Sequence, residues 1–201
     1  RLTARDANGE NPVTVSIADD PTNNADPAYF NPRVAVSSAT SALVVYVETE
    51  AGGESRIAGR IYNPDTGAVG NEISVLAFVG TNQDPAITVL GNGNYVITAA
   101  TVEEGGDQVV TYRILNSAGG NVLAATRIAS TDGDGENDRE PSVTALTGGG
   151  FVITWTNTDG DDTDVLAQIF NAAGVAQGGT IEVSQDANTL GANESAVVAL
   201  L

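Results

Sequence analysis

The sequence predicts an all-β protein built from four-stranded antiparallel repeats of about 54 residues. Pro32, Pro85 and Pro141 each open a short apolar run, and the run returns without a proline at Ser195, at spacings of 53, 56 and 54 residues. A turn signal of Asn or Asp followed by Gly keeps the same period. Such a period is typical of stacked supersecondary units, and the favoured arrangement is a set of β-propeller blades, with a β-sandwich as the alternative.

The repeat spanning residues 140–193 shows the pattern best. Short runs rich in β-branched and aromatic residues alternate there with turns rich in Gly, Asp and Asn, which is typical of antiparallel strands joined by tight loops. The expected strands are Ser142–Leu146, Phe151–Thr156, Val165–Phe170 and Thr180–Ser184.

The other repeats follow the same order, so the chain is expected to form one repeat-array domain over residues 1–201. It divides into a partial repeat (1–25), three repeats (26–80, 81–139 and 140–193) and the start of a further one (194–201). The strands expected in the two other full repeats are Arg33–Val36, Leu43–Glu48, Ile57–Tyr62, Glu72–Leu76, Ala86–Leu90, Tyr95–Thr101, Val109–Leu115 and Ala125–Ser130. The incomplete repeats supply Leu2–Arg5, Val13–Ala18 and Ala196–Leu201, which we expect to pair with each other or with a neighbouring copy of the chain.

The second strand of each repeat is apolar on both faces. In Phe151–Thr156, the aromatic residues and Ile153 point one way, and Val152 and the Thr methyl groups point the other way. A half-exposed sheet would carry polar residues on one face, so burial on both faces favours sheets stacked face to face. By the same alternation, Trp155 is expected in the core rather than as a sugar-stacking platform.

The composition removes most catalytic constellations. The chain has no Cys, Met, His or Lys, which excludes thiol chemistry, serine triads with histidine, zinc sites and Schiff bases within it. A net charge of −18 disfavours nucleic acid and anionic membranes as partners. The sequence contains no run of eighteen apolar residues, so we expect no membrane insertion. Because the sequence lacks Met and begins within a repeat, we expect it to be a piece of a longer protein.

The best-preserved repeat resembles tandem modules of large secreted bacterial surface proteins, namely RTX-type adhesins and haemolysin-type calcium-binding proteins. The matching segments are Pro141–Leu146, Gly149–Trp155, Gln168–Phe170, Gly174 and Gly178–Gly179. The match is weaker in residues 84–130, where Ala99 replaces the Trp, and weaker again in residues 27–76. The resemblance implies a secreted, modular cell-surface protein influenced by Ca²⁺, and it names no ligand.

Two acidic segments are candidate Ca²⁺ sites. Oxygen ligands at alternate positions with Gly between them suit a hard cation, and a solvated acidic turn is the alternative. The first segment contributes Asp132, Asp134, Glu136 and Asp138, and the second contributes Asp159, Asp161, Asp162 and Asp164.

From these features we expect a non-catalytic structural or spacer module of a large extracellular protein or filament, and not an enzyme. The expected partners of this module are neighbouring repeats or copies of itself. A ligand-binding adhesin module holding a glycan or a peptide is the alternative. A carbohydrate-active enzyme is the third class, but it needs paired carboxyl groups, and the acids gather in Gly-rich loops where they have no reason to hold a proton at neutral pH.

Overall fold

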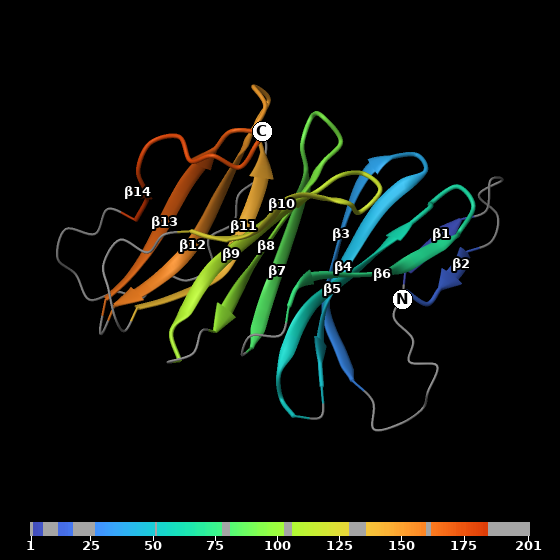
Figure 1. Ribbon diagram of the computed structural model, residues 1–201, viewed down its shortest axis with the longest axis horizontal. Helices are drawn as coiled ribbons and strands as arrows, with labels where there is room; N and C mark the ends of the chain where they lie inside the picture. The colour runs from blue at the N-terminus through green and yellow to red at the C-terminus, as the bar shows by residue number, and fades with distance from the viewer. Residues whose placement is uncertain are drawn as a thin grey trace.

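The computed structural model describes residues 2–5, 12–17, 27–50, 52–77, 81–102, 106–128, 136–159 and 162–184. That part of the chain contains strands and turns but no helix, and so no helix capable of spanning a membrane. The strands form a two-stranded hairpin and three four-stranded antiparallel meanders, and one parallel bridge joins the second and third meanders into an eight-stranded sheet. These lie side by side along the molecule (Figure 1), which confirms the predicted all-β fold with propeller-like blades.

Each meander is called a blade, and the third begins at Glu136, before the expected repeat boundary at residue 140. Blade 1 contains β3 (Ala28–Ser38), β4 (Ser41–Thr49), β5 (Ser55–Tyr62) and β6 (Val69–Leu76). Blade 2 contains β7 (Asn82–Val89), β8 (Tyr95–Val102), β9 (Gln108–Leu115) and β10 (Asn121–Arg127). Blade 3 contains β11 (Glu136–Ala145), β12 (Phe151–Asp159), β13 (Asp162–Phe170) and β14 (Ile181–Glu182). The N-terminal hairpin pairs β1 (Leu2–Arg5) with β2 (Pro12–Val15), and the strand expected at Ala196–Leu201 lies outside the described residues.

The blades pack face to face through two apolar layers. Between blades 1 and 2 the buried side chains are Leu43, Val45, Val47, Ile57, Val75, Leu76, Tyr95, Ile97, Ala99 and Leu115. Between blades 2 and 3 they are Leu90, Val96, Val110, Tyr112, Ile114, Ile128, Val143, Phe151, Ile153, Trp155 and Phe170. The middle strands β4, β8 and β12 are therefore buried on both faces along most of their length, as the sequence pattern predicted, and Trp155 is a core residue.

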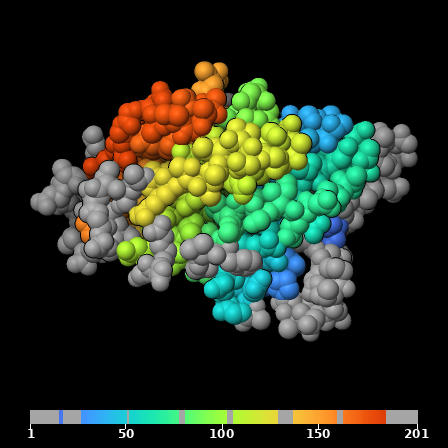
Figure 2. All heavy atoms as spheres, in the orientation of Figure 1, coloured from blue at the N-terminus to red at the C-terminus, as the bar shows by residue number. Residues whose placement is uncertain are grey.

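The first strands of neighbouring blades adjoin one another, with β3 beside β7 and β7 beside β11. One parallel bridge between Asn137 and Gln108 also links blades 3 and 2. The fourth strands lie on the other side, and β6 and β10 both cover the face seen in Figure 2. The first strands consequently form the inner edge of the blade array.

The Asn–Gly turn after the third strand packs against the preceding blade in blades 2 and 3. In all three blades the main-chain carbonyl of the Asn accepts a hydrogen bond of 2.9 Å from the main-chain N–H of the Gly. The pairs are Asn63 and Gly67, Asn116 and Gly119, and Asn171 and Gly174. A Cβ added at Gly174 would overlap Leu123 of blade 2, and one at Gly119 would overlap Ile73 of blade 1. At Gly67, no atom lies within 4 Å of such a Cβ.

This difference predicts unequal costs for the same substitution. Gly67→Ala is expected to lower the free energy of unfolding by about 1–2 kcal/mol, because φ is +74°. Gly174→Ala has a similar φ of +82° but also forces Leu123 to move, which adds about 1–3 kcal/mol. Urea denaturation of both variants measures the difference, and equal losses would contradict the docking role of the turn.

Candidate functional site

A β-bulge interrupts the first strand of every blade at the same repeat position. The pairing with the second strand shifts between Phe30 and Arg33, between Gln83 and Ala86, and between Arg139 and Ser142. Each bulge contains a residue followed by proline: Asn31–Pro32, Asp84–Pro85 and Glu140–Pro141. The first strands therefore begin before the prolines, not at them as the sequence pattern suggested, because a bulge accommodates a residue that cannot donate to the ladder.

The residue before each proline has an unusual backbone conformation. Asn31, Asp84 and Glu140 have φ values of 49°, 50° and 52°, and they are the non-glycine residues with positive φ in the described part of the chain. This region costs an L-residue about 1–2 kcal/mol, and a following proline normally holds its neighbour in an extended conformation. Strain repeated at one position, each time with a polar side chain, marks that position for function.

Because the first strands adjoin, these residues follow one another along the inner edge of the array. Burial raises the pKa of the Asp84 carboxyl group above its ordinary value of 3.8, the charge on Glu140 raises it further, and the charge on Arg33 lowers it. The three ionisable side chains thus come from three different blades, and Arg33 and Glu140 each lie within electrostatic reach of Asp84. We refer to Asn31, Arg33, Asp84 and Glu140 as the axial site.

The axial site offers two kinds of chemistry. Its carboxylates, amide and guanidinium supply hydrogen-bond acceptors and donors on neighbouring strands, which suits a ligand rich in hydroxyl groups. A carboxyl group whose pKa is raised next to a second carboxyl group is also the arrangement used for general acid–base catalysis.

The axial site lies outside the acidic glycine-rich loops that the sequence pattern indicates, and all its residues except Arg33 precede the prolines at which that pattern predicts the strands to start. The available signal was the alignment of the repeats, which places Asn31, Asp84 and Glu140 at one position, each before a proline.

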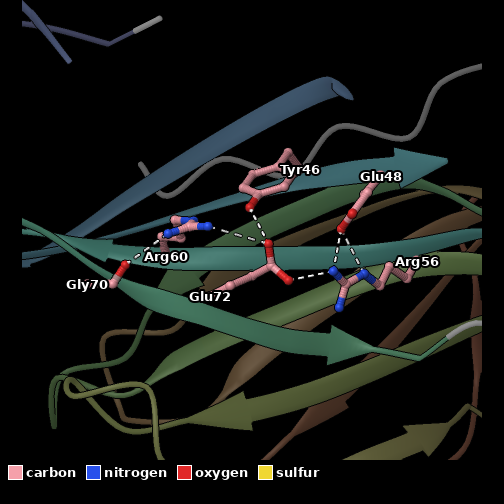
Figure 3. Close-up of polar contacts among 6 residues, drawn as sticks. All are labelled: Tyr46, Glu48, Arg56, Arg60, Gly70 and Glu72. Atoms are coloured by element: carbon pink, nitrogen blue, oxygen red, sulfur yellow. Dashed lines mark hydrogen bonds and ion pairs between the residues drawn. The ribbon is translucent and has the colours of Figure 1, made fainter. Parts of the chain in front are cut away.

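A second polar cluster lies on the face of blade 1 turned away from blade 2 (Figure 3). Arg56 donates from Nε to Glu48 Oε2 at 2.7 Å and also pairs with Glu72, while Arg60 lies 3.6 Å from Glu72 Oε2. Tyr46 donates its hydroxyl proton to the same oxygen at 3.4 Å. Burial opposes the charge on Arg56, but Glu48 and Glu72 outweigh it and raise the pKa of the guanidinium.

Strand pairing explains this cluster. Glu48 lies opposite Arg56 in the β4–β5 register, and Arg60 lies opposite Glu72 in the β5–β6 register. Each charge has an opposite partner on a neighbouring strand, so the cluster stabilises the sheet of blade 1. Because the charges of this cluster are paired with one another, we assign it a structural role and consider the axial site as the candidate for ligand binding.

The structure places the predicted Ca²⁺ ligands at one end of blade 3 or outside the described residues. Asp132, Asp134 and Asp161 lie outside them, and only the backbones of Glu136 and Asp162, at the starts of β11 and β13, are described. The three remaining predicted ligands lie in strands, with Asp138 in β11, Asp159 at the end of β12 and Asp164 in β13. Asp138 is buried and accepts a 2.9 Å hydrogen bond from Asn157 Nδ2, and Asp164 accepts one of 3.1 Å from Ser184 Oγ.

Strand register nevertheless brings the two acidic segments together. Glu136 lies opposite Asp159, which lies opposite Asp162 on the next strand. Two residues further into the sheet, Asn157 separates Asp138 from Asp164 in the same way. Among the residues whose side chains are described, no group of acids is arranged to hold a metal ion, so Ca²⁺ binding stays a prediction.

No protein-family model and no curated protein matches the sequence. Solved structures do match the fold. One is a thermostable family-43 glycoside hydrolase, with a TM-score of 0.54 and 12% identity, covering 79% of this chain and 55% of that chain. Another is Penicillium chrysogenum α-L-arabinanase complexed with arabinobiose, with a TM-score of 0.46 and 10% identity, covering 79% and 59%. This chain thus spans just over half the length of the proteins that it matches.

The match to the family-43 glycoside hydrolase corrects two expectations from the sequence. The prediction of a non-catalytic structural or spacer module is overturned, and so is the exclusion of an enzyme, because the chain shares its blade architecture with a glycoside hydrolase. The physical error lay in assuming that acids here have no reason to hold a proton. Asp84 and Glu140 lie outside the glycine-rich loops, and the fold brings their carboxyl groups within reach of each other.

Proposed function

We propose that this chain is a glycan-binding module of β-propeller architecture, with the axial site as its ligand site. The observation that carries the proposal is that the first strands of three blades adjoin and place Arg33 and Glu140 within electrostatic reach of Asp84 at the inner edge of the array. The family-43 glycoside hydrolase supports it, since that protein has the same fold and acts on glycosidic bonds. A peptide held at the same edge is the alternative outcome of the binding test.

Binding to a glycan array, followed by calorimetric titration of the best ligand, tests this function. The wild-type chain is expected to bind a saccharide, and the variants Asp84→Asn and Glu140→Gln are expected to bind it more weakly. The matched control is Asp65→Asn, which removes an exposed acid in the turn between β5 and β6. Equal affinities of all four proteins would place the ligand elsewhere, and binding to peptides alone would exclude a glycan site.

Hydrolysis of the bound glycan is the second candidate function. The raised pKa of Asp84 favours it, because a carboxyl group that keeps its proton to higher pH can protonate a leaving oxygen, and Glu140 supplies a second carboxyl group from the neighbouring blade. Release of reducing ends from a panel of polysaccharides, compared between wild type and the double variant Asp84→Asn/Glu140→Gln, separates turnover from binding.

We also propose that the protein is secreted and that Ca²⁺ stabilises it, as its resemblance to secreted calcium-binding surface proteins implies. If Ca²⁺ binds the folded state at residues 132–138, it stabilises by about 2.7 kcal/mol at a hundredfold excess over Kd. We therefore expect the melting temperature to rise in millimolar Ca²⁺ by more than in Mg²⁺, and Asp132→Asn/Asp134→Asn to remove most of the rise. An unchanged melting curve in EDTA would leave the solvated-turn interpretation, and Asp65→Asn serves as the control.

A further inference from the structure

Phe30 is an aromatic side chain exposed beside the axial site. It is 42% exposed, and the other exposed large apolar side chains in the described ranges are all Val or Ile. At the same repeat position, blades 2 and 3 carry the polar residues Gln83 and Arg139. An aromatic ring here therefore does not serve the packing that the three blades share.

The bulge in β3 directs Phe30 and Arg33 to the same side of the sheet. Phe30 lies opposite Val47, and Arg33 lies opposite Val45, with the extra residue of the bulge between them. Val45 and Val47 both belong to the apolar layer shared with blade 2. Phe30 and Arg33 thus point toward blade 2, whose first strand β7 adjoins β3 and carries Asp84.

The neighbouring aromatic residue has a different role. Tyr29 points to the opposite side and packs edge-on against Tyr46, with ring centroids 5.7 Å apart. Phe30 takes part in none of the ring pairs found among the described residues. Its exposed ring is free to meet a flat apolar surface.

We propose that Phe30 is the stacking platform for a sugar ring bound at the axial site, an inference that rests on the proposed glycan-binding function. The C–H face of a sugar packs on an aromatic ring, and its edge hydroxyl groups reach Asn31, Asp84 and Glu140 across the same edge. Two carboxyl groups against one guanidinium, in a chain of net charge −18, select a neutral saccharide over a uronate or sulfated one. The ligand class is therefore a neutral, hydroxyl-rich glycan.

Three substitutions at Phe30 separate stacking from simple apolar contact. Phe30→Trp keeps a ring, Phe30→Leu keeps bulk without a ring, and Phe30→Ala removes both. We expect Phe30→Ala to weaken binding of the array-selected neutral glycan about tenfold, Phe30→Leu to weaken it nearly as much, and Phe30→Trp to keep the affinity. The control is Val34→Ala, which removes a side chain that is 47% exposed and lies on the other side of β3, opposite Val44.

The indole in Phe30→Trp gives a second readout, because the natural Trp155 is buried and distant from solvent. Its emission is expected to shift to shorter wavelength when the neutral glycan is added, and to stay unchanged with a polyuronate. Wild-type binding that Phe30→Ala and Phe30→Leu leave intact would overturn the stacking role and leave the glycan-binding function standing. Absence of glycan binding by the wild type would overturn both.

Discussion

Replacing Trp155 with alanine is expected to lower the free energy of unfolding by about 3–5 kcal/mol. The indole is 2% exposed and belongs to the apolar layer between blades 2 and 3, together with Phe151 and Phe170, whose rings stack 4.9 Å apart. Its removal leaves a cavity that two rigid sheets cannot close, because each is held by its own ladder of hydrogen bonds. Urea denaturation followed by circular dichroism measures the loss, since the variant has no tryptophan to report by fluorescence.

Trp155→Phe distinguishes the apolar contribution from the polar one. The indole Nε1 is buried without a hydrogen-bond partner within the described structure, so phenylalanine removes an unsatisfied donor along with some volume. We expect these effects to offset each other to within about 1 kcal/mol. Val175→Ala, at a side chain that is 57% exposed, is expected to change stability by less than about 0.5 kcal/mol. A loss at Trp155→Ala as small as at Val175→Ala would refute the packed interface.

Asp84→Asn is expected to affect ligand binding and stability in opposite directions. Loss of a charged hydrogen-bonding partner should weaken binding of the glycan by about 10-fold to 100-fold. At pH 7 the same change should raise stability by up to about 1 kcal/mol, a modest gain because Asp84 is only partly buried. Burial and the charge on Glu140 disfavour the ionised carboxylate in the folded state, and asparagine has no such charge.

The sign of the pH dependence follows from the raised pKa of Asp84. The folded state binds this proton more tightly than the unfolded chain, so Asp84 contributes stability below its ordinary pKa of 3.8 and loses it as pH rises through the folded-state pKa. The stability difference between wild type and Asp84→Asn should therefore be largest at neutral pH, shrink as the pH falls from the folded-state pKa toward 3.8, and level off below 3.8. Denaturation curves of both proteins between pH 3 and pH 7 measure it. A difference that is constant over this range would show that Asp84 ionises freely in the folded state.

The blade architecture was predictable because it depends on local and periodic features. The spacing of the prolines gave the repeat, and apolar residues on both faces of Leu43–Glu48 and Phe151–Thr156 required sheets on both sides. The ends of strands were predicted less well. The last strand of blade 2 runs from Asn121 to Arg127 rather than from Ala125 to Ser130, since its side chains are mostly exposed and give no alternating pattern.

The axial site was not predictable, because it depends on contacts between residues more than fifty positions apart. Arg33, Asp84 and Glu140 carry no local motif, and their partnership arises only when the first strands of three blades adjoin. The same is true of the acidic end of blade 3. The sequence separates residues 132–138 from residues 159–164, whereas the pairing of β11, β12 and β13 sets Glu136, Asp159 and Asp162 in one row.

The repeat, the four strands of each blade and the buried second strand follow from the sequence alone, because side-chain alternation and turn residues act within a few positions. Which polar residues lie near one another depends on how the blades pack. A strained residue before a proline indicates little in one strand, but three of them along one inner edge place an amide and two carboxyl groups on neighbouring strands, near the guanidinium of Arg33. The pKa of Asp84 depends on burial and on charges from other blades, so no single repeat encodes it.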